Sequence, residues 1–92
     1  MKKREKKLMA MTPCEVFSLS QILKKFDVTN KTAIPNLNGT FSHIDIKRFN
    51  PLDSQSVGLI KKHFRKSFNK VLQYEERKDN ELYVGTFSVL CN

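Results

Sequence analysis

The sequence predicts a small α+β domain in which a helix, a strand and a second helix are followed by a β-hairpin. Three observations predict this fold: helical spacing follows a capping signal near residue 12, side chains alternate over 40–49, and two alternating segments flank Asp79-Asn80. The expected sheet is antiparallel, with roughly three strands. The 92 residues suffice for one domain. We expect a basic flexible tail at 1–11 and the domain at 12–92.

A capping box marks the start of the first helix. Thr12 is the cap, Pro13 suits the first helical position, and Glu15 stands three residues after the cap. Apolar residues then recur on one helical face, namely Val16, Leu19, Ile22, Leu23 and Phe26. Phe17 falls outside this face, so it either makes a second contact or lies exposed.

Residues 27–40 are rich in Asn, Thr and Pro, which predicts a loop with a turn at Asn38-Gly39. A short edge strand over 32–34, paired across that turn, is the alternative to a continuous loop. The alternation over 40–49 and its isoleucines predict a strand. One face of this strand carries Ser42, Ile44, Ile46 and Arg48, and the other carries Phe41, His43, Asp45, Lys47 and Phe49.

Asp53 or Ser54 can cap the second helix. On a helical wheel of 57–72 the apolar residues share one arc, namely Val57, Ile60, Phe64, Phe68, Val71 and Leu72. Leu59 is the one apolar residue on the opposite, basic side. Gly58 is costly inside a helix, which suggests a first turn constrained by packing.

The end of the sequence predicts a β-hairpin with a two-residue turn at Asp79-Asn80. The expected pairs are Lys78 with Glu81, Tyr74 with Gly85, and Leu72 with Phe87. The last strand is apolar on both faces, as a central strand would be.

The order of a helix followed by a hairpin is similar to that of a winged-helix domain, which is the alternative fold. A winged helix needs one more short helix before the recognition helix. Only the segment IDIKRFN, 44–50, could supply it, and its alternation favours a strand.

Net charge is the strongest compositional signal. The chain carries +8, which favours nucleic acid, an acidic protein or an anionic surface as a partner. No apolar run approaches the roughly 20 residues of a membrane helix, so no membrane role is expected. Two distant cysteines without an export signal indicate an intracellular, cytoplasmic protein, or a nuclear one in a eukaryote.

The basic charge is concentrated in two places. Residues 54–72 contain five basic side chains and no acidic one, whereas ordinary surface helices mix both signs. Such a face can follow a phosphate backbone. The predicted contacts are Lys61, Lys62, Arg65, Lys66 and Lys70 in the helix, with Lys2, Lys3 and Arg4 in the tail.

The function predicted from these residues is a non-catalytic nucleic-acid-binding protein, a regulator or accessory factor. DNA is slightly favoured over RNA because a helix followed by a hairpin suits groove insertion. Phe64 and Phe68 point to the core and so are not expected to stack on bases.

Two other classes remain as alternatives. A protein-interaction module, either a homodimer or a binder of an acidic partner, would use the contrast between the basic helix and the acidic hairpin. A small ribonuclease is the less favoured alternative, and it would use His43, Asp45 and Lys47 on one strand face. No cofactor or metal is predicted, since Cys14, His43, His63 and Cys91 lack the short spacings of zinc sites.

Overall fold

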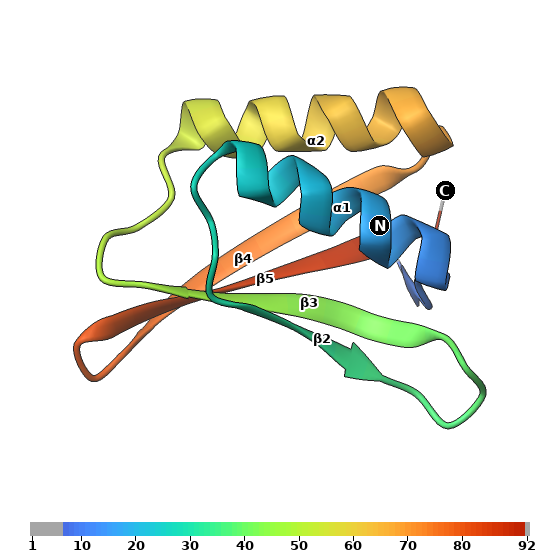
Figure 1. Ribbon diagram of the computed structural model, residues 1–92, viewed down its shortest axis with the longest axis horizontal. Helices are drawn as coiled ribbons and strands as arrows, with labels where there is room; N and C mark the ends of the chain where they lie inside the picture. The colour runs from blue at the N-terminus through green and yellow to red at the C-terminus, as the bar shows by residue number, and fades with distance from the viewer. Residues whose placement is uncertain (1–6, 92) are drawn as a thin grey trace, which may run out of the picture.

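The structure is a computed structural model that describes residues 7–91. Two helices lie on one face of a five-stranded antiparallel sheet that does not close into a barrel (Figure 1). The predicted α+β class is therefore confirmed, whereas the predicted count of three strands is too low. The winged-helix alternative is not confirmed, because 44–48 belongs to a strand and no third helix occurs among the described residues.

Helix α1, Pro13–Lys25, begins as the sequence predicts. Thr12 Oγ1 accepts a hydrogen bond from the Glu15 amide at 3.1 Å, and Glu15 Oε1 accepts one from the Thr12 amide at 2.9 Å. The apolar face of α1 packs on the core, where Leu19 and Leu23 are fully buried. Phe17 is 66% exposed, so the exposed one of its two predicted positions is correct.

Helix α2, Ser54–Phe68, is capped by Asp53 and ends where Asn69 adopts a left-handed conformation with φ of 55°. The reversal at Asn69 sends Val71 and Leu72 out of the helix and into a strand, as the predicted hairpin with Leu72 in its first strand requires. The helical wheel of 57–72 therefore runs past the end of the helix. The predicted packing constraint at Gly58 is wrong, since a Cβ built there would meet no atom within 4 Å.

Strand β5, Leu82–Leu90, is the centre of the sheet, as predicted. It pairs along one side with β4, Val71–Asp79, and along the other with β3, Phe41–Arg48. Strand β2, Lys31–Pro35, pairs with β3 and forms an outer edge, which confirms the edge strand that the sequence left open. The connection from β3 through α2 to β4 places α2 beside β4 (Figure 1).

Strand β1, Leu8–Met9, was not predicted. It pairs with Leu90 and Val89 at the end of β5, and Met11 behind it is fully buried. These residues were assigned to the flexible tail because their sequence shows no strand periodicity. They belong to the domain because β5 provides a partner that is about 80 residues away in the chain.

The register of the hairpin differs from the prediction by two residues. The turn lies at Asn80 and Glu81, with Asn80 at a φ of 58°, so Lys78 pairs with Tyr83 and Tyr74 pairs with Phe87. A shift of two residues leaves every side chain on its predicted face, because side chains alternate with a period of two. The same shift in register pairs Leu72 with Val89 instead of Phe87.

The hydrophobic core lies between the helices and one sheet face. Phe64 from α2 belongs to the same buried cluster as Phe87 and Ile44 from the sheet. The Tyr74 ring lies across Gly85 and stacks against Phe87 with ring centroids 4.5 Å apart. A Cβ at residue 85 would overlap the Tyr74 hydroxyl and ring, so this close approach requires glycine. No helix among residues 7–91 is both long and apolar enough to cross a membrane.

Candidate nucleic-acid interface

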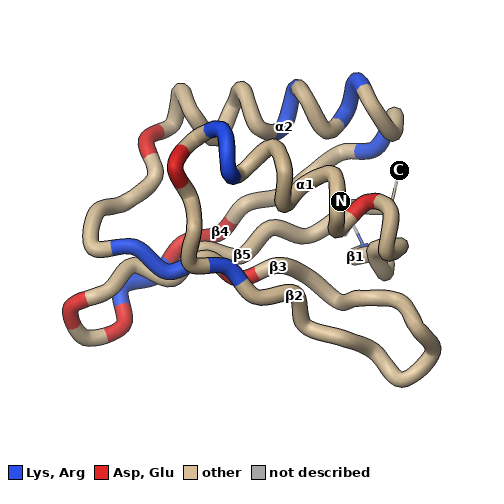
Figure 2. The backbone as a smooth tube through the Cα atoms, in the orientation of Figure 1, with Lys and Arg blue, Asp and Glu red and all other residues tan. Residues whose placement is uncertain are grey.

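The outer face of α2 is basic along its second half. Lys62, Arg65 and Lys66 are exposed, and Lys61 is half-buried at the margin of the apolar face. The helix itself contains no aspartate or glutamate. Figure 2 shows the basic positions of α2, while acidic positions are spread over the chain and two of them lie at the turn between β4 and β5.

These four cations have no acidic partner within the described chain. The ion pairs of residues 7–91 are Lys70 with Glu15 and His43 with Asp45. In water an exposed cation keeps its full ability to bind an anion only if no carboxylate of the same chain competes for it. The basic face of α2, defined as Lys61, Lys62, Arg65 and Lys66, is therefore available to an external anion.

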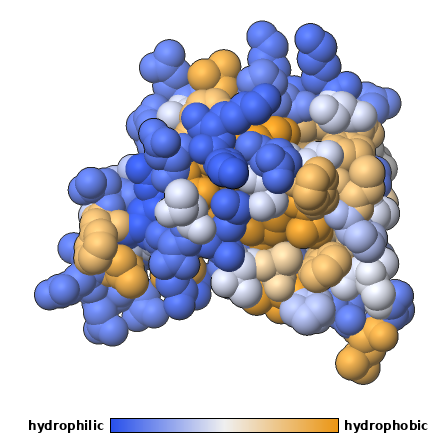
Figure 3. Space-filling view, viewed as in Figure 1, coloured by the Kyte–Doolittle hydropathy of each residue, from blue (hydrophilic) through white to orange (hydrophobic). Residues whose placement is uncertain are grey.

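A hollow of about 330 Å³ lies between α2 and the start of β4. Its lining residues are Gly58, Lys61, Lys62, Arg65, Val71 and Leu72. Three cations thus line this hollow together with the apolar Val71 and Leu72, and the lack of a side chain at Gly58 adds to its space. Hydrophilic side chains also cover the top of the molecule over α2 (Figure 3). This arrangement suits a phosphate group that brings a less polar neighbour with it.

Leu59 remains the exception on this side of α2. Its side chain is 41% exposed, so it neither reaches the core nor contributes charge. Isolated exposed leucines are common on protein surfaces and do not by themselves indicate a binding site.

Lys70 does not share the basic face of α2. It follows the helix end at Asn69, and its Nζ lies 2.5 Å from Oε2 of Glu15. Burial by itself would raise the pKa of the Glu15 carboxyl, but hydrogen bonds from Lys70 and from the Thr12 amide hold that pKa below its ordinary value. The predicted helical position of Lys70 is wrong, and its ammonium joins the end of α2 to the start of α1.

The remaining predicted contacts, Lys2, Lys3 and Arg4, lie outside the described residues. Inside them, Phe64 is fully buried and Phe68 packs beside it, with ring centroids 5.0 Å apart. Both rings face the core as predicted. Neither ring therefore lies on the basic face of α2.

The opposite face of the sheet carries a second polar group. His43 Nε2 lies 3.5 Å from Asp45 Oδ1, and Thr86 Oγ1 donates a hydrogen bond of 2.7 Å to the same carboxylate oxygen. Ser42 Oγ lies 2.8 Å from His43 Nδ1. The sequence indicated the proximity of His43 and Asp45 through their spacing in the strand. It gave no signal for Thr86, which is 41 residues away.

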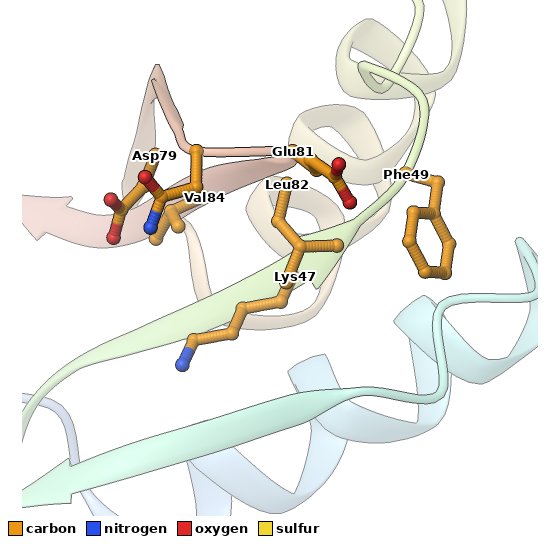
Figure 4. A pocket seen from close by; sticks show the side chains of 7 residues that line it. Lys47, Phe49, Asp79, Glu81, Leu82 and Val84 are labelled. Carbon is orange, nitrogen blue, oxygen red and sulfur yellow. The ribbon is translucent and has the colours of Figure 1, made fainter.

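Lys47, on the same strand face, lines a different hollow of about 610 Å³ at the turn end of the hairpin. Figure 4 shows its ammonium directed away from Glu81 and Phe49, which lie on the other side of that hollow. The hollow contains acidic and apolar side chains around one lysine. Such mixed charge does not select for polyanions, which favours the face of α2 as the candidate site.

Among residues 7–91 no group of three or more His, Cys, Asp or Glu side chains lies close enough to hold a metal ion. Comparisons with models of protein families, with curated proteins and with solved structures gave no match.

Proposed function

We propose that this protein binds nucleic acid through the basic face of α2, as a regulator or accessory factor without catalysis, with duplex DNA favoured over RNA. The observation that carries the proposal is the set of four neighbouring cations with no acidic partner in the described chain. An ordinary surface helix gains stability from pairs of opposite charge at i,i+4 spacing, and α2 forgoes every such pair.

The position of the hollow supports the same proposal. Lys61, Lys62 and Arg65 all line one depression of the surface. Convergent cations lower the cost of holding a phosphate in one place, because the anion meets several donors without rearrangement of the helix. Arg65 is the one member of the face that can bind a phosphate or a guanine edge with two parallel hydrogen bonds.

The test is a titration of duplex DNA and RNA across a salt series. If α2 makes four phosphate contacts, the logarithm of the binding constant for duplex DNA should fall against the logarithm of salt with a slope of roughly −3.6. Replacing Lys62, Arg65 and Lys66 by glutamine leaves about one contact, so the slope should flatten to about −0.9.

A matched control removes the same charge elsewhere. Lys24, Lys25 and Lys47 are also exposed, and their triple replacement by glutamine lowers the net charge equally. This control should keep most of the slope if the site is local to α2. Equal flattening by both triple variants would show that only the total charge matters. Absence of binding by the intact protein at low salt would refute the proposal and favour an acidic protein partner.

A further inference from the structure

The outer edge of β4 has no strand beside it in the described chain. β4 is nine residues long, pairs only with β5, and is exposed throughout 75–79. Its two-residue turn makes Asp79 and Leu82 a hydrogen-bonded pair, and such pairs alternate along an antiparallel ladder. The backbone groups that face outward therefore belong to Leu72, Tyr74, Glu76 and Lys78.

Most proteins protect an open edge with charges that repel a second copy of the same edge. β4 carries charges of both signs in the order Glu75, Glu76, Arg77, Lys78. Such an order repels a copy in some registers and attracts it in others. The charges alone therefore do not close this edge to self-association.

A two-fold axis perpendicular to the sheet pairs two β4 edges in antiparallel fashion and keeps all helices on one side. With Glu76 opposite Glu76 of the second copy, the outward backbone groups of both strands meet. Glu75 then faces Arg77 of the second copy, and symmetry repeats the pair. Tyr74 lies directly opposite Lys78 of the second copy, without a like-charge pair.

The neighbouring registers are worse. A shift in one direction sets Glu75 against Glu75 of the second copy and leaves Arg77 opposite Gln73. A shift in the other direction brings Glu76 opposite Lys78, but it sets Arg77 against Arg77 and, twice, Glu75 against Asp79. Like charges directly opposite each other destabilise a strand pair. The axial Glu76 is the one like pair in the favoured register. Its Oε2 already accepts hydrogen bonds from the Tyr74 hydroxyl at 2.6 Å and the Leu52 amide at 3.1 Å, which offset part of its charge.

We propose that two copies of this chain associate through their β4 edges into one continuous antiparallel sheet. Arg77 forms no ion pair in the described chain, although Glu75 and Asp79 flank it on the same face. A hollow of about 290 Å³ lies beside it, lined by Glu75, Glu76, Arg77 and Thr86. This space and this unpaired guanidinium are what Glu75 of the second copy would meet.

One consequence of the dimer rests on the proposed function. The hollow at Val71 and Leu72 lies about four to five residues from the axis at Glu76, or on the order of 15 Å along the strand. Two copies of the basic hollow would then stand on one side of the molecule, roughly 30 Å apart. One turn of B-DNA is about 34 Å long, so duplex DNA with two half-sites would suit the dimer.

The experiment measures self-association of the full chain by sedimentation across a range of concentrations, without nucleic acid. The wild type should change from monomer to dimer as concentration rises. Arg77→Glu should weaken the dimer at least about tenfold, because two attractive pairs become repulsive. Lys47→Glu changes the charge equally on the same sheet face, away from the edge, and should leave association unchanged.

The double variant with Glu75→Arg and Arg77→Glu exchanges the two charges and should restore the dimer. A wild type that sediments as a monomer at every concentration overturns the proposal. So does equal weakening by Arg77→Glu and Lys47→Glu, or failure of the double variant to recover. These measurements are made without nucleic acid. They therefore test dimerisation independently of whether the basic face of α2 binds nucleic acid.

Discussion

Helices α1 and α2 lie on the same sheet face, and both begin at a side-chain cap, yet their charges are used differently. α1 contains one carboxylate, Glu15, which is buried and bound to its cap residue and to Lys70. α2 contains no carboxylate, and its four cations face solvent or a hollow. The carboxylate of α1 helps to hold the fold together, whereas the four cations of α2 have no acidic partner in the described chain.

Burial and pairing, rather than net charge, therefore separate the charges that hold this fold together from those left open to an external partner. Lys70 and Lys66 are four residues apart in the sequence and look alike there. The structure assigns Lys70 to an ion pair across 55 residues, while Lys66 stays exposed. Three experiments with four substitutions test this distinction.

The inner face of α2 should contribute strongly to stability, whereas its outer face should contribute little. Phe64→Ala should lower the free energy of unfolding by about 3–5 kcal/mol, because the side chain is fully buried in the core. The neighbouring Arg65→Ala should change it by less than about 0.5 kcal/mol. Urea denaturation of both variants measures the two values. Similar losses would mean that the outer face is also structural.

The carboxylate of α1 should make stability depend on acid. Glu15→Gln should cost about 1–2 kcal/mol at neutral pH by replacing charged hydrogen bonds with neutral ones. The pKa of Glu15 is lowered in the folded state from an ordinary 4.5, so this contribution is full above that value. It is lost as the pH falls through the folded pKa. Denaturation curves of wild type and variant should therefore converge in acid, and a gap that persists there would contradict the ion pair.

Gly58 gives the smallest effect and the sharpest test of the hollow. Gly58→Ala should raise the free energy of unfolding by about 0.5–1 kcal/mol, because the new methyl group meets no atom and the helix gains propensity. Thermal denaturation measures this gain. A loss of nucleic-acid affinity alongside the gain would locate the ligand in the hollow. A loss of stability would contradict the open space around this residue.

Local signals predicted the elements well. The capping box at Thr12 and Glu15 and the alternation around Ile44 depend on residues within a few positions of each other, so the sequence shows them directly. The hairpin faces were also correct. The register was not, because the choice between turns at Asp79-Asn80 and Asn80-Glu81 depends on which residue adopts positive φ.

Contacts between distant residues were not predictable. Leu8 and Met9 form a strand only because β5 offers them a partner, and their own sequence contains no strand pattern. For the candidate site, the sequence identified the four cations of α2. It did not predict that Lys70 forms an ion pair with Glu15 instead of joining these cations. It also did not predict that Gly58 and Val71 line a hollow together with them.

The central place of β5 has a consequence for how the chain folds. β5 is the last strand in the described chain, and β1, β3 and β4 all pair with it. Until β5 has left the ribosome, the edges of these strands stay open and the isoleucines of β3 lack Phe87 as a partner. The sheet can therefore be completed only after β5 has been synthesised, with a barrier set by contacts between distant parts of the chain.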